Sequence, residues 1–445
     1  MAASISASPG TIIAPLCNKL WYTLTGYIPG SQYKYRYVID VYVDTVQIAR
    51  ILRAPDPGSN DATFNLRPIV EEYLKGDPEG NTNFPVFLNP STTGDFFDLP
   101  SAGTECLGIE VKIGESVAAS ATGEPVLTPD QDTEVIYLFN GSLPAYSSAT
   151  IADEFYLSSS SGRLLTDRDP DTFIWEARPV ALAFDSGSVF IPVWEDGNYI
   201  LSFLNDDGTY ATGHDATQVE YIIANSSGTE SPVQRIGING TFGAASPGGT
   251  VAARQKVVRM SAGPENINSV TDPAITYPPS SIAGWLYYKI RLVDALNAAS
   301  SRWYVFINRD VNNLIGCNRR DRYALIWLNQ RGGWDTLDVF DAETVESTEI
   351  ERKFYRRQPL GQEYNWEIDH LKPSQITAQK VWTLTSSYLQ FGEKQLLKSA
   401  LISKQVYLQS LEDLTILPVV LKEAAYEERR SAPYNIVLKA YLASQ

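Results

Sequence analysis

The chain has 445 residues, of which 52 are acidic and 36 are basic, so its formal charge is −16. Nucleic-acid binders concentrate Lys and Arg on one face, so this balance argues against a nucleic acid as the partner. Single hydrophobic cores stop growing at about 250 residues, so a chain of this length is expected to hold two to four domains.

Residues 1–14 are small, polar and uncharged, with a break at Pro9-Gly10. We expect them to form an N-terminal arm that orders against a neighbouring molecule, through Ile5, Ile12 and Ile13. A frayed terminus is the alternative. The segment lacks the basic start and continuous apolar stretch of a signal peptide, and the chain has no apolar run of about 18 residues. We therefore expect no membrane span and synthesis in a reducing cytoplasm.

A first β-sandwich is expected over residues 15–161. Alternate residues from Tyr33 to Val43 are apolar, which is the period of a half-buried strand. The segment Val46–Arg53 returns after a tight turn at Asp44-Thr45. A short helix is predicted after Asn65, a residue type that caps helix N-termini. The other predicted strands are Gly108–Ile113 and Glu134–Phe139.

A second all-β domain is expected over residues 162–310, because short apolar runs are separated by glycine turns. Its sharpest signal is Trp194–Tyr199, a predicted hairpin turn containing Asp-Gly. The segments Gly240–Gly249 and Ser261–Ser281 are predicted to be long surface loops that contact partners. No function can be assigned to residues 209–279. The predicted strands are Phe190–Trp194, Tyr199–Leu204, Val219–Ile223, Trp285–Val293 and Arg302–Asn308.

A third β-domain is expected over residues 311–445. The segment Tyr323–Leu328 has apolar residues at both parities, which predicts a central strand buried on both faces. Gly332-Gly333 supplies a turn, because glycine accepts positive φ. Trp334–Val339 and Thr344–Tyr355 then continue a β-meander. A helix is predicted at Gly392–Lys404, and further strands at Lys380–Thr385, Gln405–Leu408, Leu414–Lys422 and Tyr434–Leu442.

Residues suited to catalysis or metal binding are few. The chain has only two histidines, and its three cysteines are widely separated, so the sequence favours neither a Ser-His-Asp triad nor a zinc site. Asp167, Asp169 and Asp171 alternate as in a calcium loop, but Arg178 stands where the closing glutamate is needed. Because the chain has many acidic residues, a pair of carboxylates that hydrolyses glycosides is an alternative that the sequence allows. We expect no enzymatic activity, no cofactor and no metal.

Three segments of the chain, taken in order, carry a resemblance to one protein family. They are YVIDVYVDTVQIARILRAPDP at 37–57 followed by FNLRPIVEEYL at 64–74, LLTDRDPDTFIW at 164–175 followed by WEDGNYILSFLN at 194–205, and RYALIWLNQRGGWD with IERKFY within 322–357. In this order the segments resemble virion structural proteins of tailed bacteriophages, notably those of Bacteroidota hosts. The strand and turn patterns above predict serial antiparallel β-sandwich domains, immunoglobulin-like or jelly-roll-like, with one or two short helices, and the first segment resembles the opening sandwich of these virion proteins.

The resemblance implies a non-enzymatic virion component of the tail or baseplate region, assembled in the host cytoplasm. Its partners would be copies of itself and other virion proteins. Arg319, Arg320, Arg356 and Arg357 form basic patches and are candidate partner contacts, with a solvated face as the alternative. Three other functions stay open. They are capsid decoration, binding of a host surface glycan by a tail-tip protein whose aromatic rings stack on sugars, and a virion-borne depolymerase.

Overall fold

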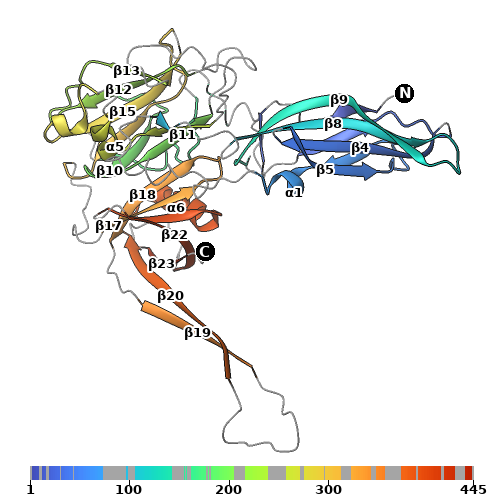
Figure 1. Cartoon of the computed structure of the whole chain (residues 1–445). Coiled ribbons are helices and arrows are strands. Elements are labelled where there is room, and N and C mark those ends of the chain that lie inside the picture. The colour runs from blue at the N-terminus through green and yellow to red at the C-terminus, as the bar shows by residue number, and fades with distance from the viewer. Residues whose placement is uncertain are drawn as a thin grey trace, which may run out of the picture. The chain divides into compact units, whose positions relative to one another are not determined.

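The structure of the chain is a computed structural model, which describes 19 segments of two or more residues and three single positions. The described residues are 3–9, 13–16, 20–30, 32–43, 45–73, 97–98, 106–142, 155, 157, 162–176, 179, 182–204, 216–238, 257–270, 275–294, 296–311, 322–341, 347–355, 372–386, 389–411, 415–425 and 436–442. The fold is mainly β, as predicted (Figure 1). It divides into two compact units: unit 1 is Met1–Asn312 with Leu328–Asp335, and unit 2 is Asn313–Trp327 with Thr336–Gln445.

The first domain of unit 1 is an immunoglobulin-like sandwich. One sheet has the order β1 (Ser4–Ala7), β3 (Trp21–Thr25), β6 (Ala62–Asn65), and the other has the order β2 (Ile13–Pro15), β9 (Pro125–Phe139), β8 (Cys106–Ala118), β4 (Tyr33–Val43), β5 (Val46–Arg53). Apolar residues of both sheets, including Tyr22, Tyr37 and Ile109, form one buried cluster. The predicted hairpin is confirmed, with Thr45 at positive φ in its turn. The predicted short helix is present as α1 (Arg67–Val70), but its N-cap is Leu66 and not Asn65; Asn65 Oδ1 accepts the Arg67 N–H at 3.2 Å.

The N-terminal segment belongs to this sandwich, so the prediction of an arm ordered against a neighbour is corrected. Strand β1 pairs with β3 of the same chain, and β2 pairs in parallel with residues 137–139 of β9. Side chains of β9 also bind the segment: Gln131 Oε1 accepts the Ala3 N–H at 2.7 Å, and Asp132 Oδ2 accepts the Ile5 N–H at 3.4 Å. A segment with little charge and a few apolar residues, such as residues 1–14, can form an edge strand as well as a free arm.

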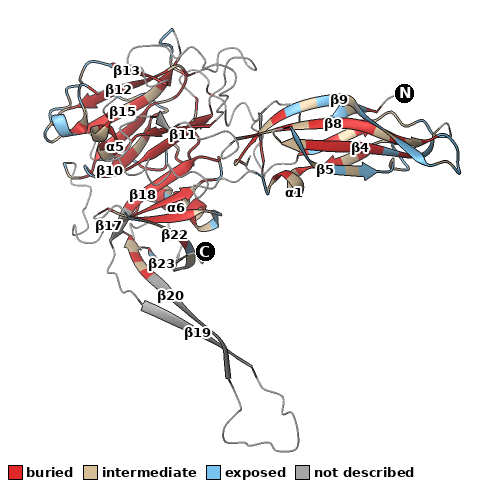
Figure 2. Cartoon of the chain, in the orientation of Figure 1, coloured by how far each residue is buried: buried red, intermediate tan, exposed pale blue. Residues whose placement is uncertain are grey.

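The second domain of unit 1 is also a two-sheet sandwich. One sheet has the order β10 (Val189–Val193), β16 (Tyr304–Asn308), β15 (Tyr287–Val293), β12 (Gln218–Ala224), β13 (Gln234–Gly237). The other has the order β11 (Ile200–Leu204), β14 (Val257–Ser261), β7 (Phe97–Asp98). Tyr221, Ile290 and Phe306 of the first sheet share a buried cluster with Leu201, Phe203 and Met260 of the second (Figure 2).

The predicted hairpin at Trp194–Tyr199 is wrong, although a turn is present. The Gly197 N–H donates to the Trp194 carbonyl at 3.0 Å, as in a β-turn. However, β10 pairs in parallel with β16 in one sheet, whereas β11 pairs with β14 in the other. The turn therefore carries the chain from one sheet to the other across the core.

The predicted surface loop at Ser261–Ser281 is also wrong in part. It contains helix α5 (Pro264–Ser269) and the 3₁₀ turn η3 (Pro279–Ser281). Ile267, Val270 and Ile275 from this segment lie in the buried cluster of the second domain. Single apolar residues spaced among Pro, Asn and Ser have no helical or strand period, so the sequence did not reveal them. The other predicted loop, 240–249, lies outside the described residues.

The described residues of unit 2 and of the adjoining glycine loop form one seven-stranded sheet and one helix. The strand order is β18 (Trp334–Asp341), β17 (Arg322–Leu328), β21 (Val406–Ser410), β22 (Ile416–Ala425), β23 (Val437–Leu442), β20 (Lys372–Ser386), β19 (Ser347–Tyr355). Helix α6 (Phe391–Ile402) confirms the predicted helix, and Gln390 with Glu393 forms a capping box at its start. Leu396, Leu397 and Ala400 of α6 share a buried cluster with Trp327 and Trp382 of the sheet.

The predicted meander is confirmed for two strands and wrong for the third. Strand β17 lies between β18 and β21, so it is central, as its two apolar faces predicted. Strand β19 does not pair with β18; it pairs antiparallel with β20, and the last residues of β20 pair with the end of β18, Phe340 opposite Ser386 and Asp341 opposite Thr385. The predicted domain boundaries at residues 14, 161 and 310 stay predictions, although the three large hydrophobic clusters fall near those ranges.

Candidate functional site

Residues Asn329–Asp335, here called the glycine loop, form a buried, hydrogen-bonded polar site in the described part of unit 1. The loop lies between strands β17 and β18, but residues Leu328–Asp335 are counted with unit 1. Asn329 organises it. Its Oδ1 accepts the N–H groups of Arg331 at 2.9 Å and Gly333 at 3.1 Å, and its own N–H donates to the Gly333 carbonyl at 2.8 Å.

Asp335 joins the loop to residues 165–168. Its side chain is fully buried, with Oδ1 accepting the Thr166 hydroxyl and Oδ2 accepting the Asp167 N–H at 2.9 Å. The Asn329 Nδ2 donates to the same Oδ2 and to the Leu165 carbonyl, both at 2.9 Å. Three donors satisfy this carboxyl, as a buried polar group requires.

The two glycines leave no space for side chains. Gly332 has φ of +83°, and a Cβ there would lie 2.2 Å from the Asn140 carbonyl oxygen. A Cβ on Gly333 would lie 2.0 Å from the Leu165 carbonyl oxygen. The sequence prediction of a positive φ therefore holds for Gly332, whereas Gly333 is required by close approach of two backbones. The Ser142 N–H donates to the Gln330 carbonyl at 2.7 Å and fixes the other side of the loop.

The surroundings of Asp335 favour its neutral form. Burial raises the pKa of the Asp335 carboxyl to about 6, and the negative charge of Asp167 acts in the same direction. The Arg168 guanidinium and the hydrogen bonds from Thr166 and the Asp167 N–H oppose this shift. The hydrogen bonds of Asp335 and Asn329 join residues 165–167 to the glycine loop, so this buried network is a structural joint.

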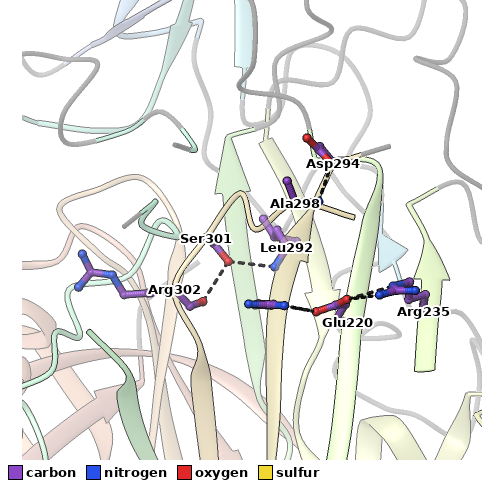
Figure 3. Close-up of polar contacts among 8 residues, drawn as sticks. Glu220, Arg235, Leu292, Asp294, Ala298, Ser301 and Arg302 are labelled. Atoms are coloured by element: carbon purple, nitrogen blue, oxygen red, sulfur yellow. Dashed lines mark hydrogen bonds and ion pairs between the residues drawn. The ribbon is translucent and has the colours of Figure 1, made fainter. Parts of the chain in front are cut away.

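A second polar site lies on the sheet of the second domain. We call it the charged strip: Glu220, Glu230, Arg235, Lys289, Arg291 and Trp303. Figure 3 shows the Glu220 carboxylate between two guanidinium groups. Arg235 Nη2 lies 2.7 Å from Oε1, and Arg291 Nη2 lies 2.7 Å from Oε2. Only 3 % of the Glu220 side chain is exposed, against 40 % for Arg235 and 24 % for Arg291.

An aromatic ring extends the strip across the sheet. The Arg291 guanidinium lies 4.3 Å from the Trp303 ring centre, and Lys289 Nζ lies 4.9 Å from it. Lys289 Nζ also pairs with Glu230 at 2.6 Å. The strip places three cations and two anions on three neighbouring strands and the residues beside them, so it can offer a partly exposed, hydrogen-bonding face to a protein.

The turn that follows β15 is closed by Asp294 (Figure 3). Its Oδ1 accepts the N–H groups of Leu296 and Ala298, both at 2.8 Å. Ser301 Oγ accepts the Leu292 N–H at 2.9 Å and donates to the Arg302 carbonyl at 3.0 Å. These bonds fix the turn, at whose tip Leu296 is 86 % exposed.

Of the candidate contact residues predicted from the sequence, the structure describes Ile5 and Ile13. Ile5 lies in β1, where it packs partly buried against the first core, and Ile13 begins β2. The predicted residues outside the described part of the chain are Ile12, Arg319, Arg320, Arg356 and Arg357. Asp335 and Glu220 were missed. Glu220 could have been found, because it interrupts an apolar strand, QVEYIIA, with a charge that needs a partner.

Metal-binding and membrane-spanning features were sought in the described residues. They contain no group of three or more His, Cys, Asp or Glu side chains that could hold a metal ion. None of their helices is long and apolar enough to cross a membrane.

Comparison with known proteins adds no assignment. No protein-family model matches this chain, and no curated protein sequence matches it.

We predict that Gly333→Ala destabilises unit 1 by about 1–3 kcal/mol, because the added methyl overlaps the Leu165 carbonyl and must displace backbone. Urea denaturation measures the loss. Gly187→Ala is the matched control, because a Cβ at Gly187 meets no atom within 4 Å. Equal stability of the two variants would contradict the close approach of the two backbones.

We predict that Glu220→Gln destabilises the second domain by about 1–3 kcal/mol. The change leaves two guanidinium groups without their carboxylate, but both arginines retain some solvent, which reduces the loss. Glu176→Gln, at an exposed position, should change stability by less than about 0.5 kcal/mol. A loss of the same size in both variants would show that the strip contributes no specific stability.

We predict that Asp335 makes unit 1 more stable in mild acid. Its folded-state pKa of about 6 lies above the ordinary aspartate pKa of 3.8, so between these values the folded state retains a proton that the unfolded state has lost. The free energy of unfolding should therefore fall as pH rises from 4 to 6, by up to about 1.4 kcal/mol per pH unit. Below pH 4 the contribution is fully present.

Denaturation of the Asp335→Asn variant at several pH values isolates this contribution. The difference in unfolding free energy between wild type and variant should change with pH over this window. Asp185→Asn, an exposed carboxyl, should leave the profile of the wild type unchanged. A pH-independent difference for Asp335→Asn would mean that Asp335 is already ionised at pH 4.

Proposed function

We propose that this chain is a non-enzymatic structural component of a tailed bacteriophage virion, in the tail or baseplate region, acting through protein–protein contacts. The proposal starts from the three sequence segments that resemble virion structural proteins. Serial β-sandwich domains, the fold that the strand and turn patterns predict, are present.

The strongest support for the proposal is a contact between two of the resembling segments. Two of the three resembling segments, 164–205 and 322–357, meet in the buried network around Asp335. Thr166 and Asp167 come from one segment and Asn329 and Asp335 from the other. The residues that carry the resemblance therefore act as a structural joint, which supports a building-block role for them.

The described tryptophans favour this role over sugar binding. Of the described tryptophans, Trp175, Trp194, Trp285, Trp303, Trp327, Trp334 and Trp382 are buried. Trp21 alone among them is exposed, at 47 %. Stacking on a glycan needs accessible ring faces, and these rings instead fill the cores of the β-domains.

The proposal is tested by separating heads and tails from purified phage particles and identifying the proteins of each fraction by mass spectrometry. We expect this chain in the tail fraction at a fixed ratio to the other tail proteins. Finding it in the head fraction would favour capsid decoration. Its absence from particles would overturn the structural role and return attention to a glycan-directed activity.

A further inference from the structure

Part of the charged strip has hydrogen-bond donors left over for a partner. Glu220 of β12 lies directly opposite Arg235 of β13 and directly opposite Arg291 of β15, so the three residues form one row across three neighbouring strands. We call them the Glu220 row. Nε and Nη2 of each guanidinium bind the Glu220 carboxylate (Figure 3). A guanidinium has five N–H donors in a planar fork, and within the described part of the chain no acceptor is assigned to Nη1 of either arginine.

The charge of the Glu220 row is not balanced within the strip. Two guanidinium groups share one carboxylate, and the neighbouring Lys289 and Glu230 form an ion pair of their own, so the strip keeps one net positive charge. The Glu220 side chain is buried, whereas the Arg235 and Arg291 side chains are 40 % and 24 % exposed. A partner can therefore reach the two cations but not the anion between them. On a chain with a formal charge of −16, this is a local surface of the opposite sign.

A buried acceptor lies beside the row. Gln218 precedes Glu220 by two residues on β12, so both side chains point to the same face of the sheet. Gln218 is 5 % exposed, and its Oε1 has no hydrogen-bond partner. A buried acceptor without a donor is unfavourable, and an N–H group of a bound polypeptide would supply the donor. The same face of the sheet therefore calls for an anion and for an N–H donor.

We infer that the Glu220 row docks an acidic polypeptide segment of a partner protein, whose carboxylates bind Arg235 and Arg291. A guanidinium fork binds a carboxylate through two parallel N–H···O bonds. Neighbouring strands lie about 4.8 Å apart, so the Cα atoms of the two arginines are about 10 Å apart across β12. Three residues of extended chain span about 10 Å, so the row fits a segment with two acidic residues three positions apart.

A polypeptide fits the row better than a nucleic acid does. Nucleic acids carry a continuous series of phosphates, and their binders gather many basic residues on one face, whereas this chain has more acidic than basic residues. The inference deepens the proposed function by naming the chemistry of a partner, and rests on it only for the setting in which that partner is met. Binding of a peptide by the purified chain does not depend on whether the chain occurs in particles.

The test is fluorescence anisotropy of a synthetic peptide, Gly-Ser-Glu-Gly-Ser-Glu-Gly-Ser with an uncharged fluorophore, titrated with the full-length chain. We expect saturable binding that weakens about threefold or more when the salt concentration is raised from about 0.05 M to about 0.3 M, because salt screens contacts between exposed charges. A peptide with glutamine in place of both glutamates should bind about tenfold more weakly, because it lacks the charge-assisted bonds. Equal binding of the two peptides, no binding of either, or tighter binding of an eight-nucleotide oligothymidylate would overturn the inference.

The Arg235→Lys variant shows whether the Glu220 row is the binding surface. Lysine keeps the positive charge beside Glu220 but lacks the planar fork, so binding of the glutamate peptide should weaken about fivefold. Arg53→Lys is the matched control and should retain binding, because Arg53 is also an exposed arginine, at 49 %, but lies in the first domain. Circular dichroism confirms that both variants are folded. Peptide binding that is unchanged in Arg235→Lys, or reduced equally in both variants, would show that the row is not the docking surface.

Discussion

Unit 1 depends on a loop whose backbone approaches two other backbones too closely for any side chain. Buried N–H and carbonyl groups must be paired, and the glycine loop meets this demand through Asn329, Asp335 and Ser142. Residues 140–142, at the end of the first sandwich, contact the loop on one side. Residues 165–168, between the two sandwiches, contact it on the other. The Trp334 N–H adds a third attachment by donating to Ser202 Oγ of β11 at 3.4 Å. Segments far apart in sequence are therefore held by one set of backbone contacts.

The sequence predicted strands well because alternation is a local property. Tyr33–Val43, Val46–Arg53 and the central strand at 322–328 are observed close to their expected bounds. The sequence predicted poorly which strands pair, because strand pairing depends on residues that are distant in the sequence. Trp194–Tyr199 has the turn residues of a hairpin, yet β10 lies beside β16 and β11 beside β14, each more than 50 residues away. The same limit explains why β19 was placed beside β18.

The candidate sites show where sequence reasoning stops. Gly332 and Gly333 were singled out as a turn, but their neighbours Asn140 and Leu165 are more than 160 residues away in sequence. The Thr166–Asp335 bond spans a similar separation. Glu220 shows the reverse case. A single charged residue in an apolar strand indicates that an oppositely charged partner is needed, but the sequence does not show that Arg235 of β13 and Arg291 of β15 are those partners. The local sequence pattern shows which residues need a partner, and only the fold shows which distant residues provide it.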